Sequence, residues 1–179
     1  SGKGNNMILF EYAFDDTDSL TQMVDNFGIL KAADLDICLL RSTLRGFGFQ
    51  KEIHLWITFT DYENANMIIL LGYVLLGHPE WQNGNIKVFT IYQEDEKQEK
   101  QERLLHLIKE GRIPVSPNNI EFIQQEETAD FRDAITLNSR DADLTILGFN
   151  DDDIEDHKAG FFEGYEGIGN VMFVNASKE

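Results

Sequence analysis

Three residues lie where a parallel sheet would present a ligand site. Asp61 follows the apolar run 53–60, while Gly148 and Phe149 close a later apolar run. Open parallel sheets bind ligands outside the carboxyl ends of their strands, at the point where the strand order reverses. We therefore predict that Asp61, Gly148 and Phe149 line the crevice of this sheet. Asp61 is the one acid placed to act as a general base, but capping the next helix is the favoured role for it or for Asn64.

The glycine-rich segments lack the residues that a phosphate cradle requires. Gly46 and Gly48 form half of a dinucleotide fingerprint, but the third glycine position is Lys51 and the pair precedes a strand instead of following one. The glycines of 160–169 have no Gly-Ser or Gly-Thr after them, and the acidic run 151–156 in front of them repels phosphate. We therefore expect neither ATP nor any other cofactor.

Metal-binding and catalytic patterns are also incomplete. The run 151–156 begins like a calcium loop, but its sixth position is Asp156 in place of glycine and its twelfth is Phe162 in place of glutamate. No serine lies in a nucleophile elbow, and no histidine pairs with another histidine, a cysteine or a carboxylate at metal-ligand spacing. The histidines are His54, His78, His106 and His157. We predict no metal site, no catalytic residue and no enzymatic activity.

Composition sets the class of protein and limits its partners. The chain has 179 residues, of which 42% are hydrophobic and 26% charged, and this composition is typical of one globular domain. Its formal net charge of −17 opposes binding to nucleic acid or directly to lipid. The single cysteine, Cys38, lies in an apolar run and indicates a reducing compartment. The longest apolar stretch, 67–76, is too short to span a membrane. The chain does not begin with methionine, so we expect it to be part of a longer protein.

Apolar runs alternate with helical patterns along most of the chain. The runs are continuously apolar, which is typical of strands covered on both faces, so the pattern predicts an α/β fold with a mostly parallel sheet and helices on both faces. We expect residues 1–51 to be the tail of a first half-domain and residues 52–179 a second half-domain, both in one continuous sheet. The helix at 64–77 is apolar on nearly every side, which predicts burial on all sides. The predicted strands are 7–12, 36–41, 53–60, 86–92, 120–124, 144–149 and 171–175.

The order of these segments resembles a known family. The strand EIHLWITF, the apolar helix NANMIILLGYVLLG and the segment HPEWQNGNIKVFTIY followed by a charged helix resemble the C-terminal cytosolic domain of cation-chloride cotransporters. The segment 139–144 also resembles the family's Ser-x-x-Ala-Asp-Leu pattern. The sequence departs from the family in two features. The second tryptophan of the strand is replaced by Ile57, and the Asp-Asp-Gly-Gly turn is replaced by the residues 61–64. The corresponding residues are Ile53, Trp56, Leu70, Leu71, Trp81, Ile86, Val88, Phe89, Leu104 and Leu105.

The resemblance implies a fold and a function. It implies a universal-stress-protein-like three-layer sandwich on the cytoplasmic side of the inner membrane, attached to the transmembrane domain of the same polypeptide. A prokaryotic member of this kind, often labelled an amino-acid permease, would regulate transport of chloride with sodium or potassium. It also implies a homodimer, and we expect the apolar surface for self-association near the first two strands. A free-standing nucleotide-binding stress protein and a small hydrolase are the alternatives.

Overall fold

The computed structural model describes residues 6–57, 62–110, 115–126 and 128–177. Its strands form one sheet in the order β1-β2-β7-β6-β3-β4-β5, and every neighbouring pair is parallel except β2 and β7. The strands are β1 (Met7–Ala13), β2 (Asp36–Ser42), β3 (Glu52–Ile57), β4 (Asn85–Tyr92), β5 (Ile120–Gln124), β6 (Leu144–Gly148) and β7 (Val171–Asn175). The predicted α/β fold with a mostly parallel sheet is confirmed, and β1 and β2 lie in the same sheet as the strands from Ile53 onward.

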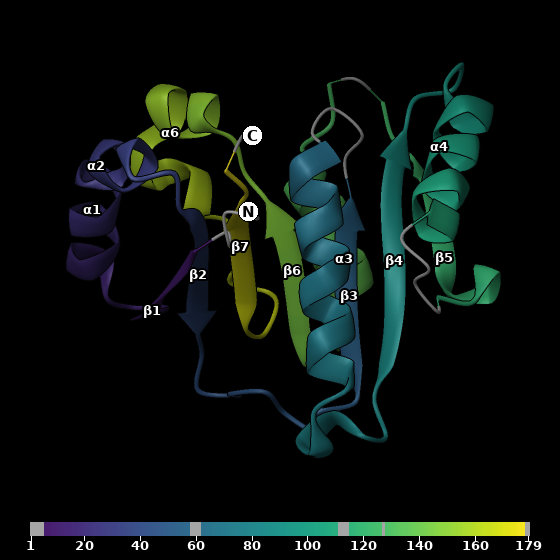
Figure 1. The fold of residues 1–179 in the computed structure, drawn as a ribbon, viewed down its shortest axis with the longest axis horizontal. Coiled ribbons are helices and arrows are strands. Elements are labelled where there is room, and N and C mark those ends of the chain that lie inside the picture. Colours follow the sequence, from purple (N-terminus) through teal and green to yellow (C-terminus); the bar gives the residue numbers. More distant parts are fainter. Residues whose placement is uncertain (1–5, 58–61, 111–114, 127, 178–179) are drawn as a thin grey trace, which may run out of the picture.

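Helices cover both faces of this sheet, as the alternation of strands and helices predicts (Figure 1). One face carries α3 and α4, and the other carries α1, α2, α5, α6 and a short 3-10 helix, η3. The helices are α1 (Thr17–Asp25), α2 (Phe27–Ala32), α3 (Tyr62–Leu76), α4 (Lys97–Glu110), α5 (Phe131–Ser139) and α6 (Asp151–His157), and η3 is Lys158–Phe162. The segment between β1 and β2 holds two short helices, because Asn26 ends α1 and begins α2.

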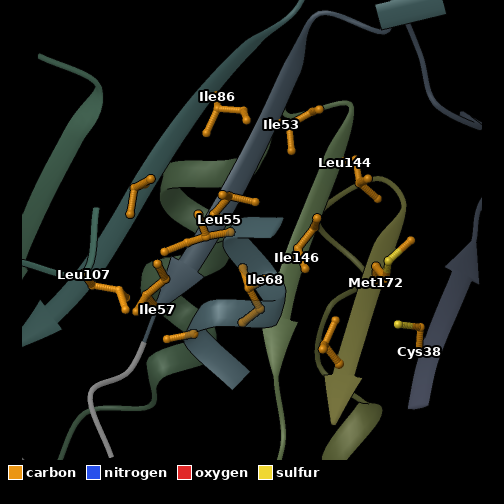
Figure 2. Close-up of a cluster of buried hydrophobic side chains, with 14 of the residues drawn as sticks. Cys38, Ile53, Leu55, Ile57, Ile68, Ile86, Leu107, Leu144, Ile146 and Met172 are labelled. Atoms are coloured by element: carbon orange, nitrogen blue, oxygen red, sulfur yellow. The ribbon is translucent and has the colours of Figure 1, made fainter. Parts of the chain in front are cut away.

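The core beneath α3 is built from the continuous apolar strands. Ile53, Leu55 and Ile57 of β3 lie at its centre, each at most 1% exposed. Figure 2 shows them packed between side chains of α3, α4 and β6, with Cys38 and Met172 at one end of the cluster. Gly72 lets α3 approach this strand closely, because a Cβ atom there would meet the Leu55 side chain at 2.9 Å. Burial raises the pKa of the Cys38 thiol to about 12, so this cysteine is a core residue and an unreactive one.

The predicted all-round burial of the α3 helix is wrong. Ile68 and Ile69 are buried against the sheet, but Leu70 and Val74 are each 60% exposed and Tyr73 is 47% exposed. In Figure 1 the helix lies over the middle of the sheet with no other element on its outer side. The helix therefore has one packed face and one apolar face in contact with solvent.

Candidate functional site

The strand order reverses between β3 and β6, which is the place where a crevice is predicted. The chain leaves β3 towards β4 on one side and returns through β6 on the other side. Gly148 ends β6 at this point, and Phe149 follows it. Asp61 lies outside the described residues.

Amide side chains occupy the space beside Gly148. Asn64, at the start of α3, donates from Nδ2 to the Phe149 carbonyl at 2.9 Å and to Asn150 Oδ1 at 3.2 Å. Its Oδ1 accepts a hydrogen bond from the backbone N–H of Ala176 at 2.7 Å. A Cβ atom on residue 148 would come within 3.2 Å of the Asn64 side chain. Glycine at this position therefore serves close packing between β6 and α3.

Phe149 contributes its backbone to the crevice and its ring to the opposite core. The ring is 1% exposed and packs against Phe27 and Phe162, with centroid distances of 5.8 and 5.3 Å. The carbonyl group accepts a second hydrogen bond, from Nδ2 of Asn175 at 2.9 Å. Side chains alternate between the two faces of a strand, so this ring turns away from α3.

Three residues at the crevice were not identified from the sequence. Lys31 of α2 donates from Nζ to Asn175 Oδ1 at 2.6 Å, and Asn175 also donates to Asp151 Oδ1 at 3.1 Å. These contacts join the end of β7 to the strand-helix-strand unit of residues 7–42. The one feature of the sequence that could have indicated this network is the polar residue Asn175 at the end of the apolar run 171–175. The crevice is therefore a network of amides that connects the two parts of the sheet.

The acidic run 151–156 begins a helix. The Asn150 backbone N–H donates to Asp153 Oδ2 at 2.8 Å, in a capping box at the N-terminus of α6. Acidic residues in a first helical turn interact favourably with the helix dipole. Over the described ranges, no group of three or more histidine, cysteine or acidic residues could hold a metal ion.

The nearest arrangement to a catalytic triad is a buried network in the core. Trp56 Nε1 donates to Ser139 Oγ at 2.9 Å, and the same oxygen forms a hydrogen bond with His54 Nδ1 at 2.8 Å. The other ring nitrogen, Nε2, lies 3.5 Å from Glu52 Oε2. Ser139 has no exposed surface, and burial lowers the pKa of His54 to about 4. The residue types are those of a hydrolase, but a substrate cannot reach the serine in this conformation.

Three cavities of the structure lie away from the predicted crevice. A cavity of about 780 Å³ at the carboxyl ends of β4 and β5 is lined by acids and amides, including Glu94, Asp95 and Gln125. Two smaller ones lie near α5 and near α1. Gly148 and Phe149 are in the walls of none of these three. No described helix combines the length and the apolar character that crossing a bilayer requires.

Comparison with known proteins supports the fold. No protein-family model and no curated protein matches the sequence. Among solved structures, the cytoplasmic domain of a prokaryotic cation chloride cotransporter superposes with a TM-score of 0.62 at 17% identity, over 98% of this chain and 66% of that one. A universal stress protein from Archaeoglobus fulgidus gives a TM-score of 0.58 at 10% identity, over 97% and 62% of the two chains. The architecture is the universal-stress-protein-like α/β fold.

A third structure agrees with this result. A candidate universal stress protein from Pseudomonas aeruginosa superposes with a TM-score of 0.56 at 14% identity, over 96% of this chain and 63% of that one. The chain thus spans slightly less than two thirds of each of these three structures. At these identities the likeness concerns the fold alone.

Proposed function

We propose that this chain is the cytosolic regulatory and dimerisation domain of a secondary transporter that carries chloride with sodium or potassium. The observation that carries the proposal is the composite sheet. A strand-helix-strand unit, residues 7–42, joins the second part through the antiparallel pair β2 and β7, and the two parts together match the cotransporter cytoplasmic domain over 98% of this chain. Most residues that carry the sequence resemblance, such as Trp56 and Trp81, are buried core residues here, whereas Leu70 and Leu105 are exposed.

The test is the coding sequence upstream of Ser1. The proposal predicts about a dozen apolar segments there, each of roughly 20 residues. The full-length protein, reconstituted in liposomes, should then take up labelled chloride when a sodium or potassium gradient is imposed. Removal of residues 1–179 should change the rate of uptake while leaving an intact path for the ion. A reading frame that starts next to residue 1 would contradict the proposal.

A free-standing nucleotide-binding stress protein is the second candidate, favoured by the likeness to universal stress proteins. Asn64 and Asn175 occupy the crevice, and Asp151 lies beside them, an arrangement that opposes phosphate. Titration with ATP and Mg²⁺ by calorimetry is expected to give no binding at micromolar concentrations. A dissociation constant in the micromolar range or below would favour the stress-protein function instead.

The outer face of α3 offers a surface for self-association. Leu70, Tyr73 and Val74 are exposed there, and residues 64–76 contain no charge in a chain of net charge −17. Two copies can therefore approach along this face with less repulsion than elsewhere. Met7 and Leu9 on the edge strand β1 are also about half exposed, in the region where the sequence placed the contact.

We expect the double substitution Leu70→Gln, Val74→Gln to weaken self-association by at least about tenfold. The change removes apolar area that would be buried between two copies, at about 25 cal/mol per Å². Sedimentation velocity at 50 and 500 mM salt would measure it, and salt should strengthen the wild-type association by screening charge. Leu137→Gln, an equally apolar and 74% exposed residue on α5, is the matched control. A wild-type monomer at both salt concentrations, or an equal effect of the control, would contradict this interface.

A further inference from the structure

The cavity near α1 lies beside the edge strand β1, at the opposite end of the strands from the amide network. Its volume is about 230 Å³, and its wall is formed by α1, η3 and the carboxyl ends of β1 and β2. Because β2 runs antiparallel to β7, the carboxyl end of β2 is remote from the crevice at the end of β7. The wall combines apolar side chains, among them Leu20 and Phe162, with the cationic side chain of Arg41.

Arg41 is a buried cation that forms no ion pair within the part of the chain that the structure describes. Its side chain comes from β2, and the residue is only 6% exposed. The structure gives it one hydrogen bond, from Nη1 to the Gly169 carbonyl at 3.4 Å, and no ion pair with any described carboxylate. A guanidinium has five N–H donors, and burying its charge without an anionic partner is costly. The arrangement is therefore incomplete without an anion.

Tyr12 adds a second unsatisfied group beside Arg41. Its hydroxyl is buried and has no hydrogen-bond partner among the described residues. Burial raises the pKa of this hydroxyl, and the nearby guanidinium of Arg41 acts in the opposite direction. Tyr12 is therefore a neutral donor, available to an anion that enters the cavity.

The rest of the wall restricts the class of anion. Leu20, Phe14 and Phe162 offer apolar contacts, and the exposed acids Glu163 and Glu166 also line the cavity. Carboxylates beside the site disfavour a multiply charged phosphate. A carboxylate group matches the planar donors of arginine with its two oxygens. The volume admits a small molecule only.

We propose that this cavity binds a small organic monocarboxylate, with the carboxylate group on Arg41 and Tyr12 and the apolar body against Leu20 and Phe162. The site is independent of the transporter function proposed above. Its ligand would stabilise the contact between α1 and η3, which belong to the two parts of the sheet.

The test is a titration of the purified chain with isovalerate at constant ionic strength. We expect saturable binding by calorimetry and a matching rise in Tm, because a ligand that binds only the folded state stabilises it. Arg41→Lys keeps the charge but loses the planar fork, so the affinity should fall by at least about tenfold. Isoamyl alcohol, which has the same apolar body and no carboxylate, should not bind.

Two tyrosine variants separate a ligand-binding role from a structural one. Tyr12→Phe removes a hydroxyl with no partner, so the Tm without ligand should stay unchanged or rise, while the affinity for isovalerate falls about fivefold. Tyr165 also has a buried hydroxyl without a described partner, but it does not line the cavity. Tyr165→Phe should therefore leave the affinity unchanged.

A further variant keeps the proposal testable if Arg41→Lys does not fold. Ala159→Leu fills the cavity from η3 without changing Arg41, and it should abolish binding. Absence of saturable binding to the wild-type chain would overturn the proposal, as would equal binding to the Ala159→Leu variant. Equal affinity for phosphate or chloride would replace it with an inorganic anion site. Loss of stability in Glu163→Gln or Glu166→Gln, with no isovalerate binding, would identify that glutamate as the counter-ion of Arg41 instead.

Discussion

Replacing Asp143 with alanine is expected to lower the free energy of unfolding by about 3 kcal/mol. Its carboxylate is 5% exposed and accepts hydrogen bonds from the backbone N–H groups of Phe49, Lys51 and Glu52, at 3.1, 2.9 and 2.9 Å. Alanine would remove the charged acceptor of three backbone hydrogen bonds, and each loss costs on the order of 1 kcal/mol or more. Gln50, between them, has a φ of 53°, a conformation that these bonds help to hold.

Urea unfolding, followed by circular dichroism, would measure the change. Asp141→Ala is the matched control, because Asp141 is an exposed acid two residues away and its loss should change stability by less than about 0.5 kcal/mol. Asp143→Asn keeps an acceptor and should fall between the two. A stability of Asp143→Ala within about 1 kcal/mol of the wild type would show that the loop holds its conformation without this carboxylate.

The Ser-x-x-Ala-Asp-Leu pattern at 139–144 now has a structural explanation. Ser139 joins His54 and Trp56 in the core, and Asp143 holds the loop that leads from β2 to β3. Ala142 and Leu144 are buried, at 1% and 0% exposure. Each of the four specified residues therefore has a packing or hydrogen-bonding role in the fold.

The sheet could be predicted because its strands are short, continuously apolar runs separated by helical patterns. The run 171–175 coincides with β7, and the run 86–92 differs from β4 by one residue. The direction of β2 relative to β7 was not predictable, since both strands have the same apolar pattern in either orientation. Pairing direction depends on contacts between residues far apart in the chain.

The exposed face of α3 shows the limit of hydrophobic periodicity. A pattern that is apolar on all sides of a helix predicts that the helix is buried on all sides. The pattern does not show whether the burying surface comes from the same chain or from another molecule. Here β3 and β6 cover one side, and Leu70 and Val74 remain in solvent. Self-association is one way for such a surface to be buried.

The polar networks could not be predicted from the sequence, because their residues are far apart along the chain. His54 and Ser139 are 85 positions apart, and Lys31 and Asn175 are 144 positions apart. None of these pairs has a characteristic local spacing, because the topology of the sheet alone brings them together. Arg41 differs from these residues, because a cation at the end of the apolar run 36–41 can be seen in the sequence, although the residues around it cannot.

Stability is expected to fall as the pH is lowered from about 6.5 to 4, and His54 should account for a large part of the loss. Burial lowers the pKa of His54 to about 4, with a smaller contribution from Lys87, against 6.5 for an unperturbed histidine. Between these values the unfolded chain binds a proton that the folded chain does not, so stability rises with pH across this window. Each unit of pKa difference corresponds to about 1.4 kcal/mol, which gives a loss of about 3 kcal/mol by pH 4. Above pH 6.5 the contribution is complete.

Carboxylates also titrate between pH 4 and 6.5. Comparing the slope of stability against pH in the wild type and in a His54 variant separates the contribution of His54 from theirs. His54→Gln should be less stable at pH 7, because the hydrogen bond with Ser139 is altered, but its stability should change less between pH 6.5 and 4 than that of the wild type. His106→Asn is the control, since the His106 side chain is 69% exposed and its loss should leave the slope unchanged. Urea unfolding at half-unit steps of pH would provide both slopes. Parallel curves for the wild type and His54→Gln would mean that the His54 ring is protonated in the folded chain, and its proton would then have to be shared with Glu52.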